Sequence, residues 1–214
     1  MSPDGVPSTA AVPEGPVDPN GLTPYQRYRL LTSLIIPRPI GWISTQSADG
    51  IANLAPFSFF NAISASPPLV AVAINPRRGE PKDTLRNIRE TGAFCVNVVS
   101  TELLEVMNAT SAEVSPQVDE FVLSGLTAVA GSEVGAPRVQ EAPASLECLL
   151  FREVDLGEGA GDLIIGEVKA IHLSPRLTVD PESWAVEPKS LAAVGRLGGN
   201  DYSLLAEIRT LPRP

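Results

Sequence analysis

The chain has 214 residues, of which 43% are hydrophobic and 19% charged, and this composition is typical of a soluble globular protein of about one domain. Its formal net charge of −9 argues against a nucleic-acid binder that depends on a general basic surface. Two cysteines and one histidine exclude most common metal sites, and no apolar run is long enough for a membrane span. The N-terminus lacks the features of a secretory signal, so we expect a cytoplasmic protein with reduced thiols.

The N-terminal segment, residues 1–24, differs in composition from the rest of the chain. It contains six prolines and three glycines but almost no large apolar side chains. Such a segment cannot bury enough surface to offset the entropy lost when it becomes ordered. We therefore expect a flexible arm over residues 1–24 and one folded domain over residues 25–214. An arm that wraps a partner subunit is the alternative.

Strand signals dominate the folded part. Residues 40–45 predict a strand that ends at a hairpin turn, because Asp49-Gly50 is a strong turn signal. Short apolar runs predict further strands over residues 69–74, 94–99, 145–154 and 162–173.

Two helices interrupt these strands. The first is expected to begin at Pro81 and to stop at Gly92, and the second covers residues 102–109. Residues 110–144 show no clear pattern. Many short strands with few helices predict a mainly β protein, a barrel or a sandwich with helical insertions.

Positive charge is concentrated in one region of this acidic chain. Residues 25–92 carry eight Lys and Arg against four Asp and Glu, which indicates a small anionic ligand bound at one place. Residues 75–84 put three cations, Arg77, Arg78 and Lys82, at the start of the first predicted helix. Since a helix N-terminus presents unpaired N–H groups and the positive end of the helix dipole, this position suits a phosphate.

Two further clusters precede these cations. Residues 37–45 place an arginine between two prolines, before a strand that ends in two hydroxyl groups. Residues 53–61 interleave small polar side chains with three phenylalanines in a chain that is only 5% aromatic. Each cluster alone is consistent with ordinary core or surface structure. Together they fit a phosphorylated planar ligand, although composition does not identify it.

Three motifs in these clusters resemble a known family. They are R-P-I-x-W-I-S-T at residues 38–45, N-L-A-P-x-S-x-F-N at residues 53–61 and K-D-T-x-x-N-I at residues 82–88. In combination they resemble the flavin reductase-like, FMN-binding split-barrel family, with a resemblance that extends from about Tyr25 to Leu205. The resemblance implies a mainly β fold with helical insertions, an FMN-binding split β-barrel. It also implies a homodimer that binds FMN near the subunit interface.

The resemblance also implies which residues contact the cofactor. Carried over position by position, they are Arg38, Ser44, Thr45, Asn53, Leu54, Ala55, Ser58, Arg77, Lys82, Thr84 and Tyr202. Arg77, Lys82 and Thr84 are implied on the phosphate side, and the hydroxyls of Ser44 and Thr45 at the ribityl–phosphate end. Further implied pocket residues are Phe60, Asn61 and Arg196. His172 is implied to face the flavin or a nicotinamide, but a structural histidine is an equal alternative.

The function that follows is an NAD(P)H-dependent flavin reductase. In this chemistry hydride passes from the nicotinamide to the flavin, so no side-chain nucleophile or general base is required, and a chain with one histidine can perform it. NAD(P)H would bind as a transient second substrate, and a monooxygenase is a possible partner. Two alternatives stay open, namely an FMN-binding carrier or redox-sensing protein without turnover, and a flavoenzyme that acts directly on an aromatic or small organic substrate.

Overall fold

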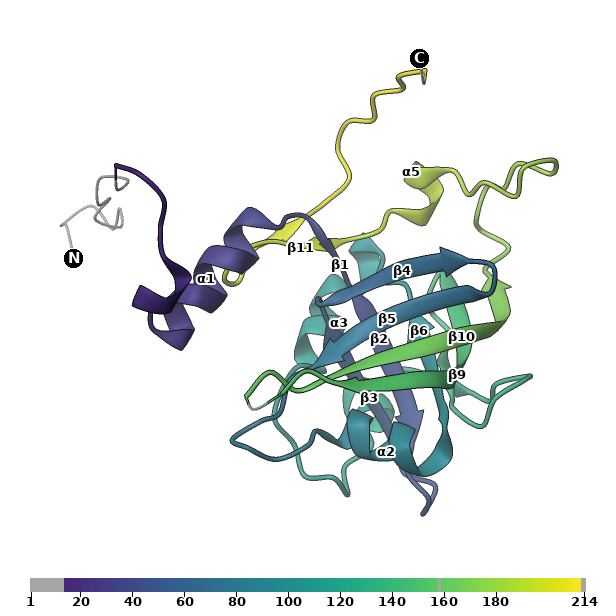
Figure 1. Ribbon diagram of the computed structural model, residues 1–214. Coiled ribbons are helices and arrows are strands. Elements are labelled where there is room, and N and C mark those ends of the chain that lie inside the picture. The colour runs from purple at the N-terminus through teal and green to yellow at the C-terminus, as the bar shows by residue number, and fades with distance from the viewer. Residues whose placement is uncertain (1–13, 158, 213–214) are drawn as a thin grey trace.

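The computed structural model describes residues 14–157 and 159–212 (Figure 1). Its main body is a seven-stranded antiparallel sheet in the order β3-β2-β6-β9-β10-β5-β4. The strands are β2 (Gly41–Gln46), β3 (Ala52–Phe57), β4 (Phe60–Ala65), β5 (Pro68–Ile74), β6 (Ala93–Asn97), β9 (Ala144–Asp155) and β10 (Asp162–Leu173). The sheet curls into an open barrel, and this confirms the predicted mainly β fold.

The smaller elements lie around this barrel. Three short strands, β1 (Arg38–Pro39), β11 (Gly195–Arg196) and β12 (Tyr202–Ser203), form a separate sheet, and β7 (Ala128–Val129) pairs with β8 (Arg138–Val139). The helices are α1 (Pro24–Leu34), α2 (Asp83–Thr91), α3 (Leu104–Ala109), α4 (Glu120–Ser124) and α5 (Pro188–Leu191), with 3-10 turns at Pro19–Gly21 and Thr101–Leu103. Among the described residues, no helix is long and apolar enough to cross a membrane.

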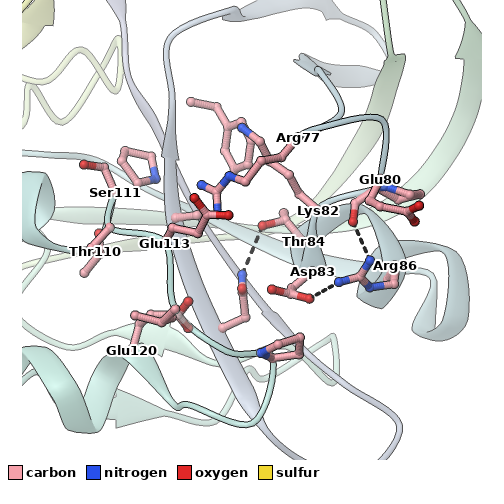
Figure 2. A pocket seen from close by; sticks show the side chains of 18 of the residues that line it. Arg77, Glu80, Lys82, Asp83, Thr84, Arg86, Thr110, Ser111, Glu113 and Glu120 are labelled. Carbon is pink, nitrogen blue, oxygen red and sulfur yellow. Dashed lines mark hydrogen bonds and ion pairs between the residues drawn. The ribbon is translucent and has the colours of Figure 1, made fainter. Parts of the chain in front are cut away.

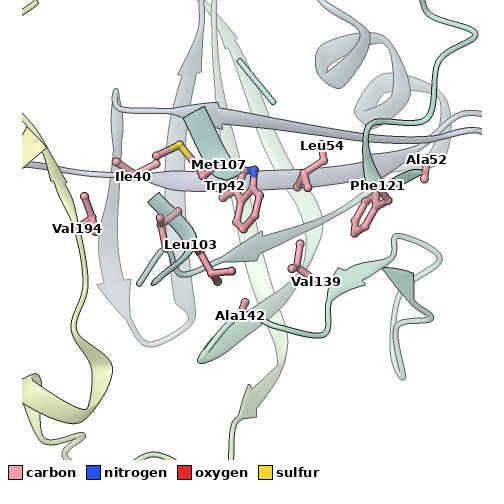
Figure 3. Close-up of a cluster of buried hydrophobic side chains, with 11 residues drawn as sticks. Ile40, Trp42, Ala52, Leu54, Leu103, Met107, Phe121, Val139, Ala142 and Val194 are labelled. Atoms are coloured by element: carbon pink, nitrogen blue, oxygen red, sulfur yellow. The ribbon is translucent and has the colours of Figure 1, made fainter. Parts of the chain in front are cut away.

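Strand β2 separates two hydrophobic cores. Trp42 belongs to a cluster with Met107 and Phe121 (Figure 3), whereas its neighbour Ile43 packs in a second cluster with Phe94. Consecutive residues of a strand point to opposite faces, so a strand between two cores is apolar on both. This is why the two apolar residues Trp42 and Ile43 are adjacent in this strand and do not alternate with polar ones.

Helix α2 is fixed against the barrel by both apolar and polar contacts. Leu85 and Ile88 are buried in the second core, and Gly92 ends the helix in the left-handed region at φ 68°. Asn87 Nδ2 donates a hydrogen bond to Thr45 Oγ1 on β2 over 3.0 Å. The predicted stop at Gly92 is thus confirmed, although the helix begins two residues after Pro81, at Asp83.

Several elements were not predicted, and α1 is the clearest of them. Thr23 and Gln26 form a capping box at its start, but Thr32 is its only buried residue. Because its apolar side chains do not face a core of the same chain, α1 lacks the one-sided apolar pattern from which a helix is predicted. Within the arm expected over residues 1–24, residues 14–24 contain the 3-10 turn, and residues 1–13 lie outside the described residues.

The close contact between Gly166 on β10 and the side chain of Phe94 on β6 gives a first testable prediction. A Cβ added at Gly166 would lie 2.3 Å from Cζ of the fully buried Phe94. We expect Gly166→Ala to lower the free energy of unfolding by about 1–3 kcal/mol, because the core must shift to admit the methyl group. Urea denaturation measures the change. Gly135→Ala is the matched control, since its added Cβ meets no atom within 4 Å, and equal effects of the two variants would contradict the prediction.

Candidate functional site

A cavity of about 420 Å³ lies at the N-terminal end of α2 (Figure 2). We call it the α2 cavity. Its walls come from β3, the loop before α2, the first turn of α2, the segment after α3, and α4. It is lined by Asn53, Ala55, Pro56, Phe57, Arg77, Arg78, Glu80, Pro81, Lys82, Asp83, Thr84, Arg86, Thr110, Ser111, Ala112, Glu113, Val114, Pro116 and Glu120. A second cavity of about 200 Å³ shares five of these residues, so the two adjoin.

Four cationic side chains line the α2 cavity, but they differ in their partners. Arg78 pairs with Glu113 at 3.3 Å, and Arg86 pairs with Asp83 and donates a hydrogen bond to a backbone carbonyl. Arg77 and Lys82 have no carboxylate partner among the residues that the structure describes. These two cations are therefore available to an anionic ligand.

Burial lowers the pKa of Lys82, and the neighbouring Arg77 lowers it further. Both effects disfavour the charged ammonium group, and an anion placed between the two cations would relieve them. The Lys82 Nζ atom also lies 5.1 Å from the centroid of the Phe57 ring, so the cationic end of the cavity borders an aromatic face.

The start of α2 adds donors to the same place. Lys82 occupies the N-cap position, and its side chain forms no capping hydrogen bond with the first turn. In the first turn of a helix the backbone N–H groups have no partner within the helix, and the helix dipole is positive there. The α2 cavity thus combines two cations with backbone donors, an arrangement that suits a phosphate group.

Five of the eleven predicted cofactor residues meet in the α2 cavity. They are Asn53, Ala55, Arg77, Lys82 and Thr84. Asn53 Nδ2 donates a hydrogen bond to Thr84 Oγ1 over 3.0 Å, which ties β3 to the first turn of α2. Leu54 lies between two of these residues on β3, and its side chain points away from the cavity into the first hydrophobic core.

The hydroxyl groups of Ser44 and Thr45 lie in the protein interior. Both residues are fully buried. Ser44 Oγ donates a hydrogen bond to the Pro137 carbonyl and accepts one from Asn97, while Thr45 Oγ1 accepts one from Asn87. The structure therefore does not bring these two side chains to the α2 cavity.

The remaining predicted residues, Arg38, Ser58 and Tyr202, do not line the α2 cavity either. The Arg38 guanidinium is buried and donates hydrogen bonds to the carbonyls of Thr32, Ile35 and Leu197, which joins the end of α1 to the C-terminal region. Ser58 Oγ lies 3.4 Å from Arg38 Nε. In this structure Arg38 holds chain segments together.

Tyr202 and Arg196 form a contact of their own. The Arg196 guanidinium lies 4.4 Å from the centroid of the Tyr202 ring, and Tyr202 Oη donates a hydrogen bond to Asn108 Oδ1 over 2.8 Å. Phe60 and Asn61, the two further pocket residues implied by the resemblance, lie on β4 and do not line the α2 cavity.

His172 belongs to a different polar cluster, centred on the fully buried carboxylate of Glu147. Its Nε2 atom lies 2.5 Å from Glu147 Oε1. The same carboxylate accepts hydrogen bonds from the backbone N–H groups of Ser132, Glu133 and Val134. Burial raises the pKa of Glu147, but these hydrogen bonds outweigh it and bring the pKa to about 2. His172 thus helps to hold the loop at residues 132–134 and lines neither cavity.

Both cysteines are free and buried, and burial raises the pKa of the Cys95 thiol to about 12 and raises that of Cys148 as well. A thiol that stays protonated is a poor nucleophile. Both thiols therefore lie in the protein interior in their protonated form.

The wall of the α2 cavity opposite Arg77 and Lys82 was not predicted from the sequence. This wall comes from residues 110–120, a stretch without a clear pattern, and it includes Glu120 on α4. Residues from such a stretch carry no local signal of a site, because only the tertiary fold brings them to β3 and α2.

Comparison with known proteins agrees with this fold. A family model for the flavin reductase like domain matches residues 33–183. Nitrilotriacetate monooxygenase component B from Bacillus cereus is similar, with 35% identity, a TM-score of 0.87, and coverage of 95% of this chain and 100% of that one. 2-Nitrobenzoate 2-nitroreductase NbaA from Pseudomonas fluorescens is 30% identical, with a TM-score of 0.85 and coverage of 94% and 96%.

A protein from Shewanella frigidimarina that is described as a flavin reductase with a split barrel domain is 26% identical, with a TM-score of 0.81 and coverage of 92% of this chain and 96% of that one. The family match covers more than half of the chain, and the barrel with its helical insertions agrees with this description. The chain therefore belongs to the flavin reductase-like family and has its split-barrel fold.

Proposed function

We propose that this protein is an FMN-binding oxidoreductase that accepts hydride from NAD(P)H, a flavin reductase. The observation that carries the proposal is the α2 cavity, in which Arg77, Lys82 and the first turn of α2 form a phosphate-binding end beside Phe57. These residues fit a phosphorylated flavin, because charge-assisted hydrogen bonds hold the phosphate and apolar side chains accept a flat ring. Family membership supports the same ligand class.

The contribution of this chain is binding and orientation. When bound, a flavin supplies the hydride-accepting chemistry itself. Arg77 and Lys82 bind the phosphate, and the hydrogen bond between Asn53 and Thr84 keeps the first turn of α2 in place relative to β3.

The comparisons support two uses of the reduced flavin. The similarity to a monooxygenase component B favours a reductase that delivers reduced flavin to a partner monooxygenase. The similarity to a 2-nitrobenzoate 2-nitroreductase favours a second candidate, in which the flavin stays bound and an aromatic compound is reduced in place. A flavin carrier or redox sensor without turnover would use the same phosphate-binding residues.

The visible absorption spectrum of the purified protein tests these proposals, with NADH and NADPH added in the presence and absence of excess FMN. Bleaching by a pyridine nucleotide, with turnover that rises on added FMN, supports the reductase. Tightly bound flavin that is reoxidised by an aromatic nitro compound supports the second candidate. Bound flavin that neither nucleotide reduces supports the carrier or sensor, and a colourless protein that binds no added FMN contradicts all three.

We also propose that the protein is a homodimer. Helix α1 and the C-terminal stretch extend away from the barrel in Figure 1, and both expose large apolar side chains. Leu34 is 70% exposed, Ile35 62% and Leu211 84%. Monomeric proteins rarely leave so much apolar surface uncovered, and a second copy of this chain would cover it. Size-exclusion chromatography coupled to light scattering is expected to give twice the monomer mass. A monomer at micromolar concentration would contradict the proposal.

A further inference from the structure

Glu120 places a buried carboxyl group in the α2 cavity, on the side opposite Arg77 and Lys82 (Figure 2). The residue is only 7% exposed. Its position is well defined, because Asp119 accepts hydrogen bonds from the backbone N–H groups at the start of α4, and the neighbouring Phe121 is buried in the first hydrophobic core. The capped start of α4 before Glu120 and the buried Phe121 after it therefore fix the residue beside the cavity.

The bonding of the Glu120 carboxyl group is incomplete. Oε2 accepts a hydrogen bond from the Leu54 backbone N–H over 3.2 Å. Among the residues that the structure describes, no side chain donates a hydrogen bond to either oxygen, and no cation pairs with the group. A carboxylate offers about four acceptor positions, and the printed hydrogen bond from Leu54 uses one of them. The remaining acceptor capacity faces the cavity.

The other polar groups on this wall are already engaged. Thr110 Oγ1 donates to the Met107 carbonyl and accepts from Trp42, and Ser111 Oγ donates to the Asn108 carbonyl. Glu113, the other carboxylate of this wall, is half exposed and pairs with Arg78. Glu120 is thus the buried carboxyl group that this wall offers to a ligand. Burial raises the pKa of Glu120, backbone hydrogen bonds from Leu54 and from Glu120 itself lower it, and the nearby carboxylates Asp83 and Asp119 raise it again. An anionic group placed here would add to this repulsion, whereas a hydroxyl donor would not.

The α2 cavity therefore has two chemically different ends. Arg77 and Lys82 make one end suitable for a phosphate, and the carboxyl group makes the other suitable for hydroxyl donors. A phosphorylated polyol carries both groups in one molecule. We propose that Glu120 accepts hydrogen bonds from the hydroxyl groups of such a polyol, which is either the ribityl chain of FMN or a ribose of the pyridine nucleotide. This inference rests on the proposed flavin and nucleotide binding.

The variant Glu120→Gln tests the inference, because glutamine keeps the shape of the side chain and an oxygen for the Leu54 N–H group. Dissociation constants are measured for FMN and for an analogue whose N10 chain is an unsubstituted pentyl phosphate without hydroxyl groups. We expect FMN binding to weaken on the order of tenfold and binding of the analogue to change less than about twofold. Glu105→Gln is the matched control, since it removes an exposed carboxylate on α3 outside the cavity.

A second arm separates the two sources of hydroxyl groups. If FMN affinity is unchanged but the KM for NADH rises about tenfold, the hydroxyl groups belong to the nucleotide and the inference holds in that form. If binding of FMN and of its analogue weakens equally and the KM for NADH is unchanged, the inference is overturned. Glu120 would then only accept the hydrogen bond from Leu54 on the edge strand β3. Thermal unfolding confirms that the variant is folded. If the wild-type protein binds neither FMN nor the analogue, the proposed function itself is contradicted. This outcome is seen before any variant is made.

Discussion

Replacing both Arg77 and Lys82 with alanine is expected to weaken FMN binding by about 2–4 kcal/mol. Neither cation has a carboxylate partner among the described residues, so a bound phosphate would be their main electrostatic partner. Fluorescence titration of the purified protein with FMN measures the loss. The affinity should also depend less on salt in the double variant than in the wild type, because screening acts on the removed charges.

Two controls make this result specific to the phosphate. Riboflavin lacks the phosphate, so its affinity should be nearly the same in the wild type and in the double variant. Arg86→Ala removes a cation that lines the same cavity but is paired with Asp83, and it should weaken FMN binding much less. An FMN affinity that is unchanged in the double variant would remove the phosphate assignment, and equal losses for FMN and riboflavin would indicate a general distortion.

Replacing Glu147 with alanine is expected to lower the free energy of unfolding by about 3–5 kcal/mol. The carboxylate is fully buried and bonded to Ser132, Glu133, Val134 and His172, so its removal leaves the buried Val134 N–H group and three partly buried donors without a partner. Urea denaturation at neutral pH measures the effect. Glu147→Gln preserves the shape and one acceptor oxygen, so it should lose less stability than the alanine variant.

The same carboxylate gives a pH dependence with a definite sign. Its pKa is about 2 in the folded protein, below the ordinary value of 4.5, so the folded state binds its proton less readily than the unfolded state. The stability that Glu147 contributes is complete above about pH 4.5 and is lost as the pH falls from there toward 2. The wild type should therefore lose more stability than Glu147→Gln between pH 5 and 3, and identical pH profiles would contradict this assignment.

The elements that were predicted correctly are those whose cause is local. The strand over residues 69–74 is an apolar run, and the strand over residues 162–173 begins with the apolar run 163–165 after a glycine-rich turn, and β5 and β10 lie there. Gly92 ends α2 because glycine enters the left-handed region with little strain. Helix α1 was not predicted because its apolar residues do not pack into the core of this chain and so show no one-sided apolar pattern.

The cationic end of the α2 cavity was also accessible from the sequence. Arg77 and Lys82 lie within a few residues of the helix that they precede, so local order already brings them to its N-terminus. Ser44 and Thr45 show the limit of such arguments. A hydroxyl group in a strand has the same sequence signal whether it faces a ligand or an internal partner. Here both hydroxyl groups accept hydrogen bonds from buried side chains, those of Asn97 and Asn87.

The opposite end of the cavity was decided by tertiary structure. Glu120 and Leu54 are 66 positions apart in the chain, yet they are joined by a hydrogen bond in the finished fold. Nothing near Glu120 in the sequence indicates that α4 will pack beside β3, because that contact depends on Phe121 entering a core built from β2, β3 and α3. Composition and local pattern determined the strands and the cationic loop, and long-range packing determined which side chains complete the site.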